Sequence, residues 1–216
     1  MDHWHTIEEV RLEAIVCCRC PLCYTRTHVV FGTGPAPARL MIVGEGPGAD
    51  EDFAGTPFVG KSGKTLDKML SDAGLTREEI WVTNIVRCRL ASLTERGLQN
   101  RAPRPEEIRA CTLWMDQEFR FVQPEVVLCL GLIPAQALIG RSLKLAEGRG
   151  KWHEGRNGIP TTVTYHPAMR YMGREKKPIV EAQMAEDFRM VAARLQPHPI
   201  RPICPISLIQ SRRRSW

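Results

Sequence analysis

Four short apolar runs alternate along this chain with longer segments whose apolar residues recur at helical spacing. The runs cover residues 40–43, 81–86, 126–130 and 161–165. Runs of this length and composition are typical of strands that are buried on both faces. Strands that alternate with helices form a mainly parallel sheet covered by helices on both sides. The sequence therefore predicts an α/β fold, a three-layer α/β/α sandwich around a central four-stranded, mainly parallel sheet.

The segments between these runs carry the signals of amphipathic helices. An apolar stripe at i, i+3, i+4 and i+7 is formed by Leu66, Met69, Leu70 and Ala73. A second helix is predicted from Pro105, which suits a first helical turn, and it carries Ile108, Cys111 and Met115 on one face. Two more helices are predicted over residues 134–139 and 178–195. We expect residues 1–195 to form one domain.

The remaining residues, 196–216, are rich in proline and arginine and lack periodicity, which predicts a flexible basic tail and a candidate segment for binding another protein. No apolar run approaches the roughly 18 residues of a membrane span, and the N-terminus lacks the layout of a signal peptide. We therefore expect a cytoplasmic protein that does not contact a membrane. The formal net charge of +6 favours a polyanionic partner, with nucleic acid first.

The eight cysteines are the next informative feature. A disulfide framework is not expected in a reducing cytoplasm, so metal binding or burial must account for them. Cys129 lies inside an apolar run, where burial as a small hydrophobic side chain is the better explanation. Two candidate pairs overlap near the N-terminus, Cys17 with Cys20 and Cys20 with Cys23. Four thiolates can hold a [4Fe–4S] cluster or a zinc ion, and the residues alone leave both open.

Residues 55–62 match the GxxxxGK[ST] pattern of a phosphate-binding loop. Such a loop surrounds phosphates with backbone N–H groups, whereas this one has proline and bulky residues at its centre and follows an acidic segment. We therefore reject nucleotide hydrolysis. Lys61, Ser62 and Gly63 still open a helix, where they are expected to bind one backbone phosphate of a nucleic acid.

Seven motifs in unbroken order resemble those of the family-4 uracil-DNA glycosylases. They are Cys17-x2-Cys20 and residues 26–32 (RTHVVFG), 40–52 (LMIVGEGPGADED), 55–60 (GTPFVG), 83–89 (TNIVRCR), 100–103 (NRAP) and 166–168 (HPA). Any one motif is weak evidence, whereas seven in order are strong. The resemblance implies the uracil-DNA glycosylase fold and a monofunctional hydrolase of base excision repair. Such an enzyme extrudes uracil from DNA, cleaves its N-glycosidic bond and leaves an abasic site.

The resemblance also implies the metal ligands. The family uses two N-terminal cysteines, one after the second strand and one on the next helix, which correspond to Cys17, Cys20, Cys88 and Cys111. It implies a structural [4Fe–4S] cluster, with zinc as the alternative. The 22 residues between the last two cysteines exceed the family's expected spacing, and we expect the extra segment, 91–99, to be a surface loop. A related group has a covalently reacting histidine in a longer loop here, but this segment contains none.

The implied base pocket combines residues from loops at the carboxyl ends of strands, where parallel sheets place their sites. Phe58 is expected to stack on the extruded uracil. The Asn84 amide is expected to pair with the O4 and N3–H edge, which cytosine presents in reverse. His166 is expected to hydrogen-bond O2 as charge develops on the leaving base. The alternative to these roles is a purely structural one. Phe58 would then be a core aromatic, Asn84 would cap a loop and His166 would be a structural histidine.

The group that activates water is the least defined part of the implied site. Gly46, expected at the uracil, stands where the best-known uracil glycosylases have an aspartate, an absence that family-4 enzymes share. The family's candidates for placing or polarising water are Glu51 and Asn100, with Glu45 positioning the loop. A solvated carboxylate is the alternative for Glu51. A dissociative reaction needs little activation of water if the uracil anion is well stabilised.

Residues 166–172 are expected to contact DNA, with Met169 or Tyr171 filling the vacated stack and Arg170 meeting a phosphate. The expected substrate is uracil-containing DNA, single- or double-stranded, and the protein is expected to be a monomer. Two alternatives remain, a DNA-binding or lesion-sensing module without turnover and an iron–sulfur electron-transfer protein. The intact set of base-recognition residues argues against the second.

Overall fold

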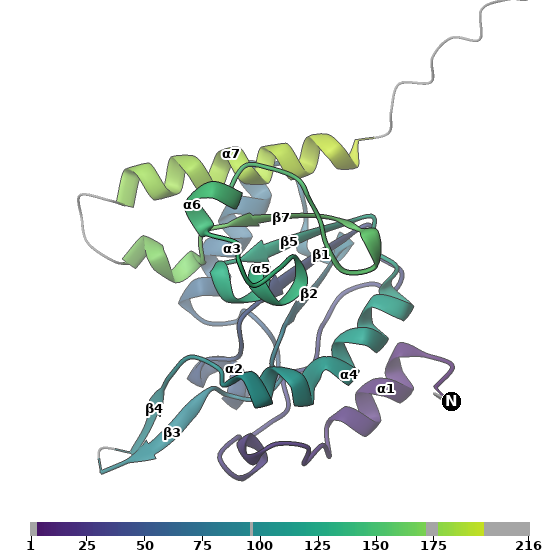
Figure 1. Ribbon diagram of the computed structural model, residues 1–216, viewed down its shortest axis with the longest axis vertical. Coiled ribbons are helices and arrows are strands. Elements are labelled where there is room, and N and C mark those ends of the chain that lie inside the picture. The colour runs from purple at the N-terminus through teal and green to yellow at the C-terminus, as the bar shows by residue number, and fades with distance from the viewer. Residues whose placement is uncertain (1–3, 96, 172–176, 197–216) are drawn as a thin grey trace, which may run out of the picture.

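The computed structural model describes residues 4–95, 97–171 and 177–196. Its centre is a five-stranded sheet in the order β2-β1-β5-β7-β6 (Figure 1). The first four strands run parallel to one another. They are β1 (Leu40–Gly44), β2 (Ile80–Asn84), β5 (Val126–Leu130) and β7 (Pro160–Thr164). The predicted α/β class and mainly parallel sheet are confirmed, and each expected strand is present with ends shifted by at most two residues.

The predicted strand number of four is wrong by one. The fifth strand, β6 (His153–Glu154), pairs antiparallel with β7 at the edge of the sheet. It is two residues long and half-exposed, so it has no apolar run that a reading of hydrophobic pattern could detect.

The expectation of a surface loop over residues 91–99 is also wrong. These residues form a hairpin of two antiparallel strands, β3 (Ala91–Thr94) and β4 (Gly97–Asn100), which extends away from the body (Figure 1). Gly97 has a φ of 86°, a conformation that glycine adopts at little cost, and it begins the return strand. The strands are four residues long and only Ala91 in them is buried, which explains why the apolar pattern did not reveal them.

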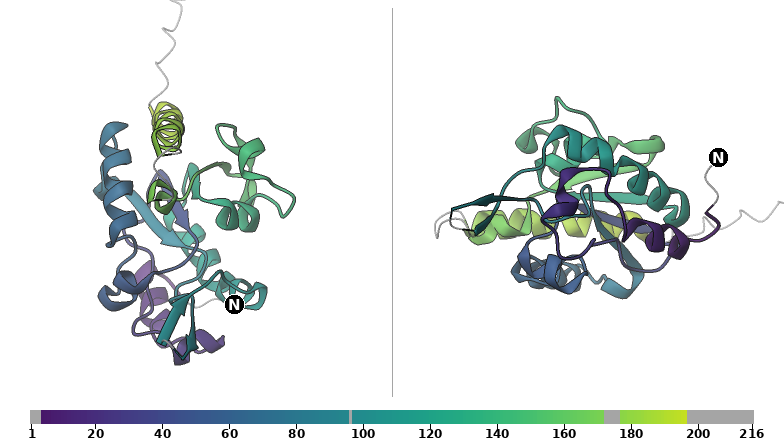
Figure 2. Two further views of the ribbon diagram at one scale, coloured as in Figure 1. Left: turned by 90° about the vertical axis from the view of Figure 1, so that its left-hand side faces the viewer. Right: turned by 90° about the horizontal axis from the view of Figure 1, so that it is seen from below.

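Alternating side chains of the central strands bury the two faces of the sheet against two sets of helices. Leu40 and Ile42 of β1 pack in a cluster with α3 (Lys61–Asp72) and α7 (Lys177–Leu195). Met41 and Val43 pack in a second cluster with helices of the opposite layer. These helices are α1 (Ile7–Ala14), α4 (Pro105–Val122) and α5 (Leu132–Leu138). Figure 2 shows the sheet between the two layers, as the three-layer prediction requires.

Short helical segments complete the described chain. They are η1 (Pro21–Tyr24), α2 (Ala49–Ala54), η2 (Arg77–Glu79), α6 (Leu145–Gly148), η3 (Arg156–Gly158) and η4 (Pro167–Tyr171). Of the helices described, none is long and apolar enough to cross a bilayer. The tail predicted over 196–216 lies, from residue 197 onward, outside the described residues. The proposed domain boundary near residue 195 therefore stays a prediction.

Candidate active site and cysteine cavity

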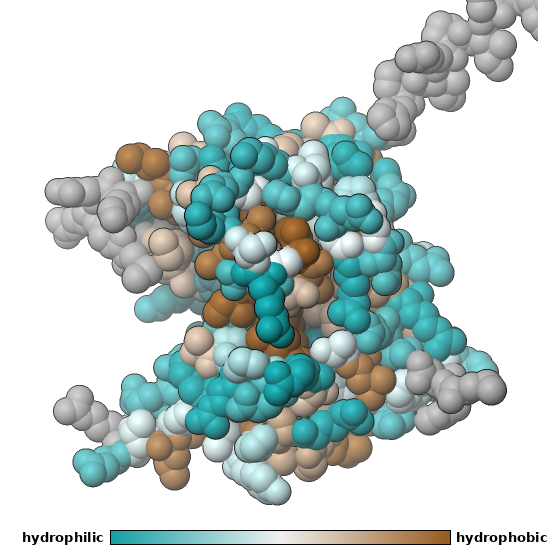
Figure 3. All heavy atoms as spheres, in the orientation of Figure 1, coloured by the Kyte–Doolittle hydropathy of each residue, from teal (hydrophilic) through white to brown (hydrophobic). Residues whose placement is uncertain are grey.

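A cavity of about 580 Å³ opens at the carboxyl ends of β1, β2 and β7. In Figure 3 the surface is hollowed on the side toward which these strands run, above the β3–β4 hairpin. Sequence-predicted residues that line the cavity are Glu45, Gly46, Glu51, Phe58, Lys61, Ser62, Asn84, Asn100 and His166. Segments far apart in the chain are thus brought to one site, as expected for the ends of parallel strands.

The ring of Phe58 and the amide of Asn84 converge over Gly44. A Cβ on this glycine would lie 2.4 Å from Asn84 Oδ1 and 2.5 Å from Phe58 Cζ, so only a residue without a side chain leaves room for both. Phe58 and Asn84 are 6% and 2% exposed, yet both reach the cavity wall. No described residue hydrogen-bonds the Asn84 amide. A flat apolar surface and a free amide edge therefore stand side by side.

The backbone of Phe58 is held in the left-handed region, with a φ of 55°. This conformation is unusual for a bulky residue and persists only where the surroundings enforce it. Arg77 provides such support, since its guanidinium donates to the carbonyls of Pro57 at 2.6 Å and Phe58 at 3.0 Å. Gly63 closes in from below, where a Cβ would lie 1.8 Å from the Phe58 carbonyl oxygen. The ring orientation is thus built into the fold.

His166 follows β7 and is half-buried at the cavity wall. Its Nδ1 accepts the backbone N–H of Ala168 at 3.1 Å. An accepting Nδ1 leaves the proton of the neutral ring on Nε2. Burial lowers the pKa of His166 below its usual 6.5, and the nearby Glu51 charge opposes that shift. The ring is therefore a neutral donor through Nε2.

Glu51 connects the two loops that frame the cavity. Its Oε2 accepts the Gly48 N–H at 3.1 Å, and its Oε1 accepts the Gly60 N–H at 2.9 Å. The Glu51 side chain is therefore anchored at both oxygens. This differs from the alternative of a freely solvated carboxylate. Glu45 lies deeper, where burial raises the pKa of its carboxyl. Asn100 lies at the end of β4, and its Oδ1 accepts from Arg89 Nε at 3.1 Å.

Gly46 faces Leu90 across the cavity floor. A Cβ at Gly46 would lie 2.5 Å from Leu90 Cδ1, so any side chain there would displace the leucine. An aspartate cannot occupy this position without rearrangement. The space that an acidic side chain at residue 46 would need is therefore filled by the apolar side chain of Leu90.

The start of α3 supplies the polar end of the cavity. Lys61 and Ser62 lie in its first turn and line the cavity, after a loop that follows helix α2 and not a strand. This setting agrees with the rejection of a phosphate-binding loop. Gly63 does not line the cavity, because it is buried against the Phe58 backbone. Arg170 belongs to η4, but its side chain lies outside the described part, while Met169 packs partly into the α3–α7 core.

The four predicted metal ligands line a second, smaller cavity on the α1–α4 side. Cys17 follows α1, Cys20 precedes η1, Cys88 follows β2 and Cys111 lies on α4. Cys23 and the exposed Cys18 do not line it, and Cys129 is fully buried within β5, as predicted for a small hydrophobic residue. None of the described cysteines forms a disulfide. Within the described residues, no three metal-ligating side chains are close enough to share one ion.

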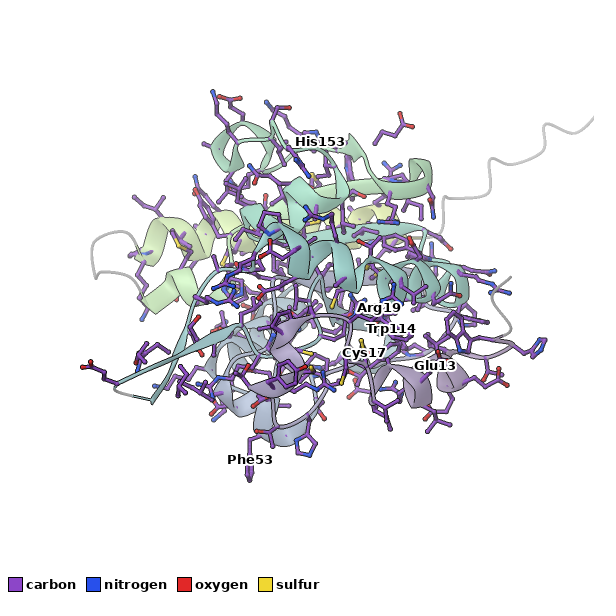
Figure 4. The ribbon with its side chains drawn as sticks, turned by 60° about the horizontal axis from the view of Figure 1, so that its bottom comes forward. Glu13, Cys17, Arg19, Phe53, Trp114 and His153 are labelled. Atoms are coloured by element: carbon purple, nitrogen blue, oxygen red, sulfur yellow. The ribbon has the colours of Figure 1, made fainter. Side chains whose placement is uncertain are left out.

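Nitrogen donors point at the sulfur atoms of this cavity. Arg26 donates to Cys88 Sγ and Trp114 donates to Cys17 Sγ, both at 3.4 Å; Figure 4 shows Cys17 beside Trp114. Burial raises the pKa of the Cys88 thiol to about 12, an effect that the Arg26 charge opposes. The cavity wall also contains Arg87, whose buried Nε has no partner among the described residues.

Arg87 is held by a buried ion pair beneath the cavity. Its guanidinium donates to Glu118 Oε2 at 2.7 Å, and both side chains are at most 1% exposed. Glu118 Oε1 accepts from Thr83 Oγ1 at 3.1 Å and from the Gly32 N–H at 3.2 Å. The carboxylate is thus fully engaged, while Arg87 keeps one unsatisfied N–H at the cysteine cavity.

Comparison with known proteins bears on this arrangement of two cavities. Residues 31–189 match the uracil DNA glycosylase superfamily. The chain is 37% identical over 181 residues to the type-4 uracil-DNA glycosylase of Pyrobaculum aerophilum, covering 81% of this chain and 87% of the relative. It is 35% identical over 176 residues to the type-4 enzyme of Thermotoga maritima, covering 80% of this chain and 85% of the relative. It is 31% identical over 194 residues to the type-4 enzyme of Archaeoglobus fulgidus, covering 86% of this chain and 92% of the relative.

The chain belongs to the type-4 uracil-DNA glycosylases. This confirms the family that the seven motifs predicted. As in any member identified by motifs, the residues between the motifs were harder to find. For this type-4 chain they include Arg77, which holds Phe58, and Leu90, which fills the space at Gly46. Gly44, beneath Phe58 and Asn84, lies inside the motif at residues 40–52, but its role there was not predicted. Gly44 alone had a sequence signal, as the glycine that directly ends an apolar run.

Proposed function

We propose that this uracil-DNA glycosylase, a hydrolase, binds extruded uracil between Phe58, Asn84 and His166. The observation that carries the proposal is the convergence of the Phe58 ring and the unbonded Asn84 amide over Gly44. Uracil-containing DNA is the substrate that this activity implies. Extrusion of the nucleotide costs about a few kcal/mol, which stacking and hydrogen bonds in the cavity must offset.

Asn84 is proposed to select uracil over cytosine. Its Oδ1 would accept the uracil N3–H, and its Nδ2 would donate to O4. Cytosine has an acceptor at N3 and a donor at C4, so the same amide would leave both bonds unmade at a cost of about 1–3 kcal/mol. The position of the amide supports this role, because it lines the cavity and has no partner among the described residues, so both its oxygen and its nitrogen can bind a base.

His166 is proposed to stabilise the leaving group. As the bond between C1′ and N1 breaks, its electron pair goes to the uracil ring and charge develops on O2. A neutral Nε2–H, held in orientation by the Ala168 N–H on Nδ1, would donate to that oxygen. Donors fixed in this way contribute about 3–4 kcal/mol to catalysis.

Water is proposed to add to C1′ near Glu51 and Asn100. Each Glu51 oxygen already accepts one backbone N–H and retains capacity for a second bond, so the carboxylate can orient a water molecule. The water oxygen bonds to C1′ as the bond from C1′ to N1 breaks, and the proton that the water releases neutralises the uracil anion. Glu45 is proposed to support the loop, and Lys61 and Ser62 to contact a backbone phosphate, with Arg170 as a further proposed contact.

The cysteine cavity is proposed to hold a structural [4Fe–4S] cluster. Cys17, Cys20, Cys88 and Cys111 would be its ligands, and they line one cavity. Such a cluster is bound by four thiolates, and its sulfide atoms accept hydrogen bonds. The donors Arg26 and Trp114 and the unpaired Arg87 Nε fit a negatively charged, sulfur-rich group. Iron and acid-labile sulfide analysis of the purified protein distinguishes the cluster from zinc.

Further proposals follow from the sequence. The enzyme is proposed to be a cytoplasmic monomer of one domain that accepts uracil in single- and double-stranded DNA, with residues 196–216 available to bind another protein. Strand preference is measured with matched single- and double-stranded uracil oligonucleotides.

The decisive experiment is incubation of the protein with a uracil-containing oligonucleotide and its thymine counterpart, followed by cleavage of abasic sites. We expect abasic product only from the uracil substrate. Binding without product under enzyme excess would instead indicate a lesion-sensing module. The absence of both binding and product would overturn the base-site proposal.

A further inference from the structure

The β3–β4 hairpin begins and ends at the candidate active site. Leu90, directly before β3, and Asn100, at the end of β4, both line the cavity. Three views show the hairpin extending from the body (Figures 1, 2 and 4). It is therefore an arm whose base is part of the cavity wall and whose outer half is free of the core.

One face of this arm is apolar and continuous with the cavity. Leu93 and Leu98 are directly opposite each other in the strand register, as are Ala91 and Asn100. Side chains alternate between faces along a strand, so both leucines share the face of Asn100, which lines the cavity. Leu93 is 77% exposed. A cross-strand leucine pair on an outlying hairpin contributes little to the fold, because it touches no core.

The base of the arm is firmly held. Arg101 donates to both carboxylate oxygens of Glu107, at 2.8 and 2.5 Å, and its Nε donates to Ser92 Oγ at 2.9 Å. Arg89 spans the strands through its bond to Asn100. These contacts fix the arm relative to α4. Glu107 offsets the charge of Arg101, whereas Arg89 bonds the neutral amide of Asn100 and adds positive charge beside the cavity.

We propose that the hairpin is a DNA-contacting arm, in which Leu93 and Leu98 pack against the sugars and bases beside the extruded nucleotide. This proposal rests on the proposed function, since it places DNA at the cavity. Apolar side chains stabilise distorted DNA by filling the space beside unstacked bases. Of the two expected wedges, Met169 is partly packed in the core, and the side chain of Tyr171 lies outside the described part of the chain. Leu93 is far more exposed than Met169.

Two features favour DNA over another protein as the partner. The apolar face continues directly into the site that must receive the nucleotide, and the arm's base carries Arg89, which is bonded to a neutral amide. A stable protein interface buries about 1,200–2,000 Å² in total, far more than two leucines present. Nucleic acid needs no such area, because phosphate contacts supply much of the affinity.

The test compares the wild type with the Leu93→Ser/Leu98→Ser variant and with Gln99→Ala, an exposed residue on the opposite face of the same hairpin. Single-turnover excision of uracil from duplex DNA gives the half-saturating enzyme concentration and the maximal rate. We expect the leucine variant to raise the half-saturating concentration about tenfold. Its maximal rate and its inhibition by free uracil should be unchanged, and Gln99→Ala should match the wild type.

A photoreactive amino acid gives a second, direct readout. Placed at position 93 it should crosslink to the nucleotides flanking the uracil, whereas at position 99 it should not. Failure of the wild type to release uracil would refute the proposed function itself. An active wild type, with unchanged DNA affinity in the leucine variant and no crosslink at 93, would overturn the arm. The proposal for the arm would also be overturned if the leucine variant changed only the oligomeric state, which sedimentation measures.

Discussion

The cavity at the candidate active site, called the base cavity below, and the cysteine cavity differ in which polar groups are left unpaired. In the base cavity the backbone holds Glu51 through two N–H groups and His166 through one, while the Asn84 amide has no partner among the described residues. In the cysteine cavity, donors point at sulfur, and the Arg87 Nε has no described partner. The first leaves open an amide edge that suits a transient ligand. The second offers its donors to the resident cluster that we propose.

One strand end serves both cavities. Asn84, at the end of β2, faces the base cavity, and Cys88, four residues later, faces the cysteine cavity. Between them, Arg87 is paired with Glu118, which also binds Thr83. Damage to the cysteine side is therefore expected to affect folding, whereas damage to the base side is expected to affect chemistry alone.

The largest effect is expected from Asn84→Ala. Loss of the amide should reduce uracil excision by about 10³-fold, since pairing and positioning of the base both fail. Single-turnover rates measure the change. The free energy of unfolding and the metal content should stay near wild type, because no described residue bonds this amide. The exposed Lys144→Ala serves as a control, and an Asn84→Ala rate within tenfold of it would contradict the assignment.

The next effect concerns stability on the cysteine side. Glu118→Ala leaves Arg87 buried without its partner, and we expect a loss of about 3–5 kcal/mol in the free energy of unfolding. Urea denaturation measures it. Glu125→Ala is the matched control, because it breaks an arginine pair with Arg39 in which both side chains are more than half exposed. Equal stability of the two variants would show that the buried pair does not support this cavity.

A smaller effect is expected at the floor of the base cavity. Gly46→Ala should push Leu90 away and lower excision by about 1–2 kcal/mol of transition-state stabilisation. Leu90→Ala restores the space, so the double variant should recover part of the loss in single-turnover rates. Additive losses would mean that residue 46 acts through something other than Leu90.

The smallest effect is a dependence on pH. Burial lowers the pKa of His166 below 6.5, so the ring is neutral at pH 7. As the pH falls, the unfolded ring takes up its proton first, near 6.5, and folding stability declines until the folded ring also titrates. As the pH falls, the rate of excision should stay constant to below pH 6.5. It should then decrease, because a protonated Nδ1 no longer accepts the Ala168 N–H. An NMR titration of the ring measures this pKa, and a value above 6.5 would contradict the expectation.

Sequence reasoning was most successful where burial imposes a pattern. The four parallel strands were found because burial on both faces requires a continuous apolar run. It failed for β6 and for the β3–β4 hairpin, whose exposed, short strands carry no such run. Arg77 could not have been found, because its role depends on two carbonyls 19 and 20 residues away in the chain.

The sequence by itself determined the fold class and the family, because apolar runs and ordered motifs depend on local residue types. Only the tertiary structure decided which side chains meet. It brought Phe58 and Asn84 together over Gly44, and it divided one strand end between two cavities. The physical reason is that the direction of a side chain beyond a strand depends on contacts from distant segments, and the chain reveals these only when it is folded.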